Sequence, residues 1–266
     1  MSNPLSSPVS DTAEFYAHFG LPDRCYLGKK LFKKHFHEHG QLNATDRKAF
    51  VEDIEHIEWR YTLKPATIHI PRHVDEIVDY TEIAVIHVTL LAEKRVTRIA
   101  DVIQKTIPYP LLIVFSLDQG EGERLSLSVA DKRISRADRD KLVVETAQDS
   151  GWIDLANPEP WEPAFFNDFR ARAFSYQDLR AFYQDIFKRV VGLNCARHTG
   201  RYESADQKTT PTVDRLDALR RLERLDDERT ELSNKLKKEK NLGTRVQLNM
   251  RVKEISDRIE AIKQTL

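Results

Sequence analysis

Apolar and polar residues alternate along much of the chain in patterns that predict a mixed α/β domain. Every second residue from 57 to 63 is apolar, which is typical of a strand with one buried face. Residues 82–90 and 111–117 are apolar on both faces, as in central strands that are covered on both sides. Between them, Val96 to Ile107 carries apolar residues at helical spacing, and Pro108 ends that helix. This strand–helix–strand unit implies a parallel pair joined by a right-handed crossover.

Further strands and helices are predicted around this unit. A turn at residues 118–122 leads into the alternating segment 124–130, which predicts an antiparallel strand, and residues 141–146 predict another. Ser175 and Asp178 form a capping-box pattern before a helix that continues to Val190. Short helices are expected at 12–19, 29–37 and 45–54. We therefore expect an α/β (α+β) fold, a mixed β-sheet with a strand–helix–strand crossover and flanking helices.

The C-terminal part of the chain carries two apolar seams with spacings of three and four residues. The first seam consists of Ala218, Leu222, Leu225, Arg229, Leu232 and Leu236, and the second of Leu248, Val252, Ile255, Ile259, Ile262 and Leu266. One continuous helix would put the seams out of phase, so they belong to separate helices. Reflection about Leu242 pairs them, with Gly243 as a left-handed helix end and Thr244 as the next N-cap. This predicts an antiparallel helical hairpin (coiled coil).

These patterns also divide the chain into parts. Residues 1–11 are expected to be a flexible N-terminus, 12–200 the mixed α/β domain, 201–211 a linker and 212–266 the helical hairpin. A parallel coiled-coil homodimer with a skip at Gly243 is the competing interpretation. Whether the seam closes within one chain or between two chains therefore stays open, and the oligomeric state with it.

Composition restricts the class of protein. The 266 residues include 42 basic and 42 acidic ones, and a formal net charge of zero argues against nucleic-acid binding over the whole surface. Cys25 and Cys195 are the only cysteines, too few for a disulfide framework, which favours a reducing compartment. No apolar stretch approaches the length of a membrane span. We expect a cytoplasmic protein without membrane contact and without a cofactor.

Charge is nevertheless segregated within the sequence. Around the hairpin turn, basic residues are opposed only by Glu239 and Glu254; these basic residues are Lys235, Lys237, Lys238, Lys240, Arg245, Arg251 and Lys253. A secondary basic patch consists of Arg24, Lys29, Lys30, Lys33 and Lys34. The basic hairpin tip is consistent with a solvated helix face, and also with contact to DNA phosphates or to an acidic partner surface. Both groups are candidate contact sites for nucleic acid or a protein partner.

Candidate chemistry is sparse. His35 and His39 share one helical face with His37 nearby, but the HExxH order is absent, so no metal site is assigned. A nuclease of the restriction-enzyme type needs carboxylates for Mg²⁺ and an acid-x-Lys spacing on the next strand. Asp79 and Glu82 supply candidate carboxylates, whereas residues 111–117 lack that spacing. No catalytic residue is assigned.

Six short blocks are spread over most of the chain: FYAHFGLP (15–22), EDIEHIEWRYTLKPATIHI (52–70), EIAVIHVTL (82–90), IPYPLLIVF (107–115), LSLSVADKR (125–133) and KEKNLGTRVQLNMRVKEI (238–255). Together these blocks resemble a bacterial family, the domain of unknown function DUF4391. None of them is a catalytic motif. The resemblance implies an accessory part in defence against foreign DNA, because family members tend to be encoded beside helicase-like translocases and DNA methyltransferases of restriction-modification type.

One preferred hypothesis and two alternatives follow. The preferred one is a non-enzymatic adaptor whose α/β domain docks on a helicase (translocase) or DNA methyltransferase partner, while the hairpin contacts that partner or DNA. The first alternative is a metal-dependent nuclease that uses Asp79 or Glu82. The second is direct binding of duplex DNA through the basic tip of the hairpin.

Overall fold

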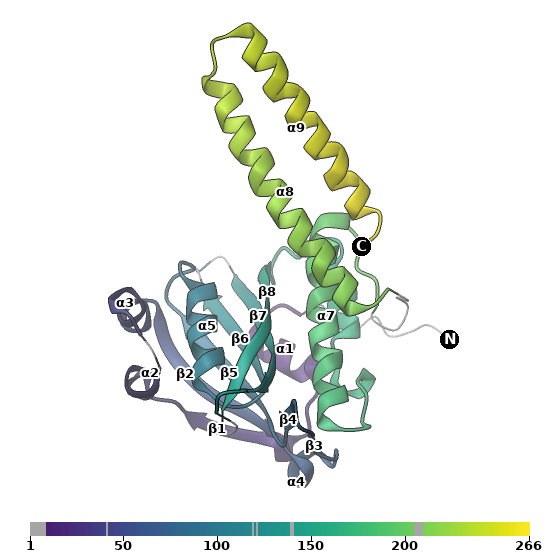
Figure 1. Ribbon diagram of the computed structural model, residues 1–266. Coiled ribbons are helices and arrows are strands. Elements are labelled where there is room, and N and C mark those ends of the chain that lie inside the picture. The colour runs from purple at the N-terminus through teal and green to yellow at the C-terminus, as the bar shows by residue number, and fades with distance from the viewer. Residues whose placement is uncertain (1–8, 41, 119, 121, 139–140, 205–209) are drawn as a thin grey trace.

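A mixed α/β body and two long projecting helices make up the computed structural model (Figure 1). It describes residues 9–40, 42–118, 120, 122–138, 141–204 and 210–266. The expected flexible N-terminus at 1–11 and the expected linker at 201–211 therefore lie partly outside the described residues. The mixed α/β fold class with a C-terminal helical hairpin is confirmed.

The helices and strands have the following bounds. The helices of the body are α1 (Thr12–Phe19), α2 (Lys33–His39), α3 (Ala44–Glu52), α4 (Pro65–Ile68), α5 (Val96–Thr106), α6 (Glu162–Asp168) and α7 (Leu179–Thr199), with short 3₁₀ turns η1 (Asp23–Cys25) and η2 (Ala171–Ala173). The strands are β1 (Tyr26–Lys30), β2 (Ile54–Leu63), β3 (His73–Val74), β4 (Asp79–Tyr80), β5 (Ile83–Leu90), β6 (Leu111–Asp118), β7 (Glu123–Ile134) and β8 (Leu142–Asp154). The projecting helices are α8 (Thr212–Lys238) and α9 (Leu242–Lys263).

The main sheet has the strand order β1-β2-β5-β6-β7-β8. Strands β5 and β6 are parallel and joined through α5, as the sequence predicts, and the other neighbours in the sheet are antiparallel. Ile83, Val85 and Ile86 on β5 are fully buried, which fits a central strand covered on both faces. Strands β3 and β4 form a separate two-stranded sheet.

Two apolar cores lie on opposite faces of the sheet. On one face, Phe36 of α2, Phe50 of α3 and Ile103 of α5 pack against the strands. On the other face, α1, α6 and α7 form a larger core, which includes Phe15 and Phe182. This larger core continues into the first turns of the hairpin, so that the arm is anchored to the body at its base (Figure 1).

Two local predictions within the α/β body were wrong. The expected helix at 29–37 begins only at Lys33, because Lys29 and Lys30 pair with β2 as part of strand β1. The helix α7 is capped by Asp178, whose carboxylate accepts a hydrogen bond from the Ala181 amide at 2.8 Å, and Ser175 lies outside the cap. Pairing with β2 therefore delays the start of α2, whereas a local cap three residues after Ser175 sets the start of α7.

The hairpin closes its seams within one chain. Leu222 and Leu225 of α8 and Ile255 and Ile259 of α9 are buried, and towards the tip the seam residues become only half-buried. Arg229, which interrupts the first seam, turns outward and pairs with Asp226 of its own helix at 2.5 Å.

The predicted turn at 241–244 differs in detail. Asn241, not Thr244, is the N-cap of α9, and its side chain accepts a hydrogen bond from the Thr244 amide at 3.1 Å. Gly243 lies inside the first turn of α9 and is not left-handed. An asparagine cap closes the turn, so the left-handed residue that the sequence suggested is not needed.

Candidate functional site

The tip of the hairpin carries cations that are free of ion pairs. Lys235 pairs with Glu231 at 2.6 Å, and Arg251 pairs with Glu228 and Glu254, each at 3.3 Å. The side-chain cations of the other five basic residues form no ion pair or hydrogen bond within the described ranges; these residues are Lys237, Lys238, Lys240, Arg245 and Lys253. The acidic residues thus neutralise only two of the seven cations, and a positive end remains.

An apolar stripe lies beside these cations. Leu242, Val246 and Met250 occupy successive turns of α9, and all three are exposed. Exposed apolar residues at this spacing form one continuous strip on a helix. The tip therefore combines positive charge with an apolar strip, which is the combination that a macromolecular contact uses.

The secondary basic patch is split by the fold. Lys29 and Lys30 lie on strand β1 and Arg24 on the 3₁₀ turn before it, and all three are exposed. Lys33 turns inward instead, where its ammonium group donates to the Ile54 carbonyl and burial lowers its pKa. Lys34 pairs with Glu38 at 3.3 Å. Three of the five cations therefore remain for an external contact.

The two candidate carboxylates, Asp79 and Glu82, lie in different environments. Asp79 lies on β4, and its carboxylate accepts a hydrogen bond from the Thr81 amide at 3.0 Å. Glu82 is half-buried and lines a pocket of about 290 Å³. Burial raises the pKa of Glu82, and the neighbouring Lys64 and Thr62 partly offset this rise. Asp79 therefore stabilises a local turn, whereas Glu82 faces a pocket.

The pocket beside Glu82 is also lined by two members of the secondary basic patch. Arg24 and Lys29 line it together with Lys64, Tyr26 and the half-buried Trp59; Leu27, Cys25, Thr62 and Thr67 complete its wall. Residues from separate segments of the sequence therefore meet at the β1 edge of the sheet. This pocket joins cations, aromatic rings and one carboxylate.

No group of three His, Cys, Asp or Glu side chains capable of holding a metal ion occurs among the described residues. His35 and His37 lie on α2, where the ring of His35 contacts Phe36 and that of His37 contacts Phe50. These two histidines therefore belong to the packing around the α2 and α3 helices.

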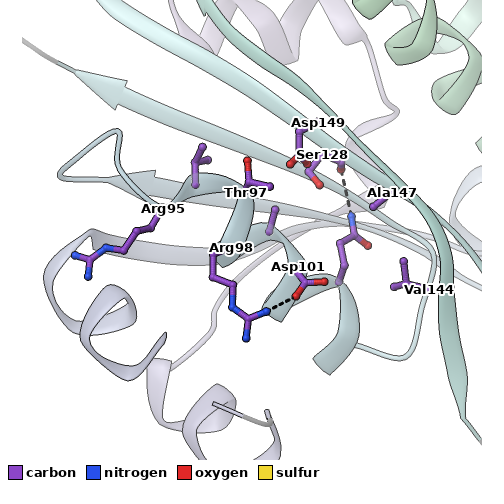
Figure 2. Close-up of a pocket in the computed structure, with 11 residues that line it drawn as sticks. Arg95, Thr97, Arg98, Asp101, Ser128, Val144, Ala147 and Asp149 are labelled. Carbon is purple, nitrogen blue, oxygen red and sulfur yellow. Dashed lines mark hydrogen bonds and ion pairs between the residues drawn. The ribbon is translucent and has the colours of Figure 1, made fainter. Parts of the chain in front are cut away.

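A larger cleft of about 650 Å³ lies between α5 and strands β7 and β8 (Figure 2). Arg98 at its rim donates to both carboxylate oxygens of Asp46 at 2.7 Å and to Asp101 at 2.7 Å. Deeper in the cleft, burial raises the pKa of Asp149, and the hydroxyls of Thr97 and Ser128 beside it partly offset this rise (Figure 2).

The charges of this cleft are largely satisfied internally. Arg95, the second arginine at the rim, donates to the two carboxylate oxygens of Asp53 at 2.6 and 2.7 Å. Gln104 is buried and donates to the Leu111 and Ser128 carbonyls, both at 3.4 Å, while its side-chain carbonyl has no partner in the described part of the chain. The cleft therefore presents hydrogen-bond acceptors, and its cations are already neutralised.

A buried polar cluster lies where α1 covers the sheet. The Nε2 atom of His87 on β5 lies 2.9 Å from the hydroxyl oxygen of Ser116 on β6. The centroid of the His87 ring is 5.6 Å from that of the Tyr16 ring. Arg60 stacks over Tyr16 at 4.2 Å and donates to the Glu58 carboxylate at 2.9 Å. Burial, together with the positive charge of Arg60, lowers the pKa of His87 to about 4.

This depressed pKa predicts acid sensitivity. The unfolded chain binds a proton at His87 near pH 6.5, whereas the folded chain does so only near pH 4. The stabilising contribution of the neutral ring is present above pH 6.5 and is lost as the pH falls towards 4. We expect His87→Gln to reduce the loss of unfolding free energy between pH 6.5 and 4 by up to roughly 3 kcal/mol.

Urea unfolding of both proteins at several pH values measures this difference. His198→Gln is the matched control, because His198 also has a pKa lowered by burial but lies on α7 outside the cluster. Parallel pH profiles of the wild type and His87→Gln would show that His87 does not cause the acid loss.

Sequence reasoning missed both the cleft and the polar cluster. The one local signal for the cluster was a histidine within the apolar run 82–90. The residues of the cleft come from α5, β7 and β8, and no spacing in the sequence relates them. Only the packing of α5 over the far end of the sheet brings them together.

Taken together, the fold and these surfaces define an α/β domain with a projecting helical arm that has a basic tip. The chain belongs to the family described as Domain of unknown function (DUF4391), which matches residues 19–259. No curated protein and no solved structure matches the chain. Among the described residues, no helix has both the length and the apolar character needed to cross a membrane.

Proposed function

We propose that this protein is a non-enzymatic adaptor of a bacterial, restriction-modification-like defence system. The α/β body docks on a helicase or DNA methyltransferase partner, and the hairpin extends to contact DNA. The observation that carries the proposal is the arm itself: it projects away from the body and ends in five cations without ion pairs among the described residues (Figure 1). The partner class is taken from the family resemblance.

The dimensions of the arm support a bridging role. With 27 residues in α8 and 22 in α9, the arm reaches on the order of 35 Å at 1.5 Å per residue. The lower half is fixed to the body by buried apolar residues, and the upper half exposes charge on its outer faces. A rigid base with a charged end holds two macromolecules at a set distance. The apolar stripe of α9 fits a protein partner, or a second copy of this chain.

Duplex DNA binding tests the role of the tip. We expect Lys237→Glu combined with Lys238→Glu to weaken binding by about tenfold or more at low salt, because two phosphate contacts are lost. The slope of log K against log salt should also become shallower by about two. Fluorescence anisotropy with a labelled duplex, measured over a range of salt concentrations, gives both quantities.

The matched control carries the same change of charge at the base of the arm. Arg221→Glu with Arg224→Glu alters two exposed cations on the same helix, about 20 Å or more from the tip. Equal losses in the two double variants would contradict a specific role of the tip.

Metal-dependent cutting of the same DNA with Mg²⁺ or Mn²⁺, abolished by Glu82→Ala, would overturn the non-enzymatic role in favour of a nuclease. Co-purification from the native cell tests the partner class.

A further inference from the structure

Strand β1 is an edge strand whose side chains are all exposed, and it lies at the opposite end of the molecule from the hairpin tip (Figure 1). The segment from Arg24 to Lys34 contains five basic residues and no acidic one. It also exposes two aromatic rings, Tyr26 at 53% and Phe32 at 68%. Basic and aromatic side chains are therefore interleaved along the exposed β1 edge.

The ring of Tyr26 is held in position by its surroundings. Its hydroxyl donates to the Glu58 carboxylate at 3.2 Å, and its ring meets Tyr61 edge-on at 5.6 Å. Gly28 has a φ of +61°, and a Cβ at this position would lie 2.8 Å from the Tyr26 ring. The glycine therefore allows the ring to lie across the strand, where about half of it remains exposed.

The cations of this edge are available for an external anion. Arg24, Lys29 and Lys30 form no ion pair with a described residue, and the ammonium group of Lys30 lies 6.0 Å from the centroid of the Phe32 ring. Arg24 and Lys29 also line the 290 Å³ pocket that Trp59 walls on one side. A chain of phosphates can follow these cations while a flat group enters the pocket or lies on a ring.

We propose that the β1 edge binds single-stranded nucleic acid. Arg24, Lys29 and Lys30 hold the phosphates, and unpaired bases stack on Tyr26 and Phe32. An acidic peptide would pair with the cations, but its carboxylates do not stack on the exposed aromatic rings. The bases of a duplex are stacked on one another inside the helix, so their faces cannot stack on these rings. Cations interleaved with aromatic rings match a single strand best, because every base offers a face for stacking.

Glu82 is the carboxylate of the pocket beside the β1 edge. It lines the pocket next to Lys64, and the positive charge of this neighbouring ammonium group offsets that of the carboxylate. Its oxygens can accept hydrogen bonds from the N–H groups of a base that enters the pocket. The proposal does not depend on the hairpin arm, since the two surfaces lie at opposite ends of the molecule (Figure 1).

The test measures binding of labelled oligo-dT and oligo-U to the full chain by fluorescence anisotropy. With three phosphate contacts, from Arg24, Lys29 and Lys30, we expect the slope of log K against log salt to be about −2. Lys29→Glu with Lys30→Glu should weaken binding about tenfold or more at low salt. Phe32→Leu, which keeps an apolar side chain but removes the ring, should weaken it roughly fivefold or more, whereas Phe32→Tyr should retain it.

The tip variant Lys237→Glu with Lys238→Glu is the matched control, because it changes the charge by the same amount at the other surface. It should leave single-strand affinity unchanged, while the β1 variant leaves duplex affinity unchanged. Absence of single-strand binding, or equal losses in the two variants, overturns the proposal. Binding that is sensitive to the lysines but indifferent to Phe32→Leu also overturns it, because such binding shows a simple polyanion surface.

Discussion

Replacing Arg189 with methionine is expected to lower the free energy of unfolding by about 3–5 kcal/mol. Arg189 lies on α7, and its side chain is fully buried. Its guanidinium group donates to the Asp168 carboxylate at 3.1 Å and to the Asp168 carbonyl at 3.0 Å, and it stacks over Phe174 at 4.7 Å. The loss is large because the variant removes a fully buried cation and its hydrogen bonds to both the carboxylate and the carbonyl of Asp168.

Urea unfolding at neutral pH measures this effect, and α7 itself offers the control. Arg180 on the same helix has a side chain that is 44% exposed and reaches Asp75 only at 3.6 Å. Arg180→Met should therefore change the stability by less than about 1 kcal/mol. Similar losses in the two variants would mean that the buried ion pair is not what stabilises the junction between α6 and α7.

The second large effect is expected in the hairpin arm. Ile259→Ala should destabilise the packing of α9 by about 2–5 kcal/mol, because Ile259 is only 2% exposed and belongs to the core shared with α7 and α8. The loss should be local, because α9 packs mainly against α8 and not directly on the sheet. Hydrogen exchange should therefore become faster at α9 amides while the amides of β5 and β6 keep their protection.

Met250→Ala serves as the control on the same helix, because Met250 is 68% exposed and should cost less than about 0.5 kcal/mol. Global loss of protection in Ile259→Ala would show that the arm and body unfold as one unit. Unchanged exchange at α9 would contradict the burial of Ile259 in the seam, and light scattering on the full chain distinguishes closure within one chain from a homodimer.

The sequence predicted the central elements of the fold because their signals are local. Strands β5 and β6 are apolar on both faces and α5 has helical spacing, so the crossover followed from residues 82–117 alone. The two C-terminal seams likewise contain enough residues to predict both helices and to favour their antiparallel pairing over a parallel homodimer. Patterns of this length outweigh single exceptions such as Arg229.

The candidate sites were predictable only as charges in the sequence. The basic residues of the tip were predictable from the sequence because α8 and α9 meet at a short turn. The sequence did not show which of these cations form ion pairs within the arm. Four residues of the secondary basic patch fall within the helix predicted at 29–37, although Lys29 and Lys30 lie on β1 and Lys33 is turned inward. Edge pairing with β2, a contact with a distant segment, overrides the local helical preference.

The sequence by itself determined the class of fold, the position of the arm and the regions where positive charge gathers, since all three depend on short-range patterns. Only the tertiary structure decided that Glu82, Arg24 and Lys29 share one pocket and that α5 and β8 enclose a cleft. It also decided that His87 meets Ser116 and Tyr16. These contacts join segments far apart in the chain, and side-chain packing across the sheet, which no local pattern encodes, sets them.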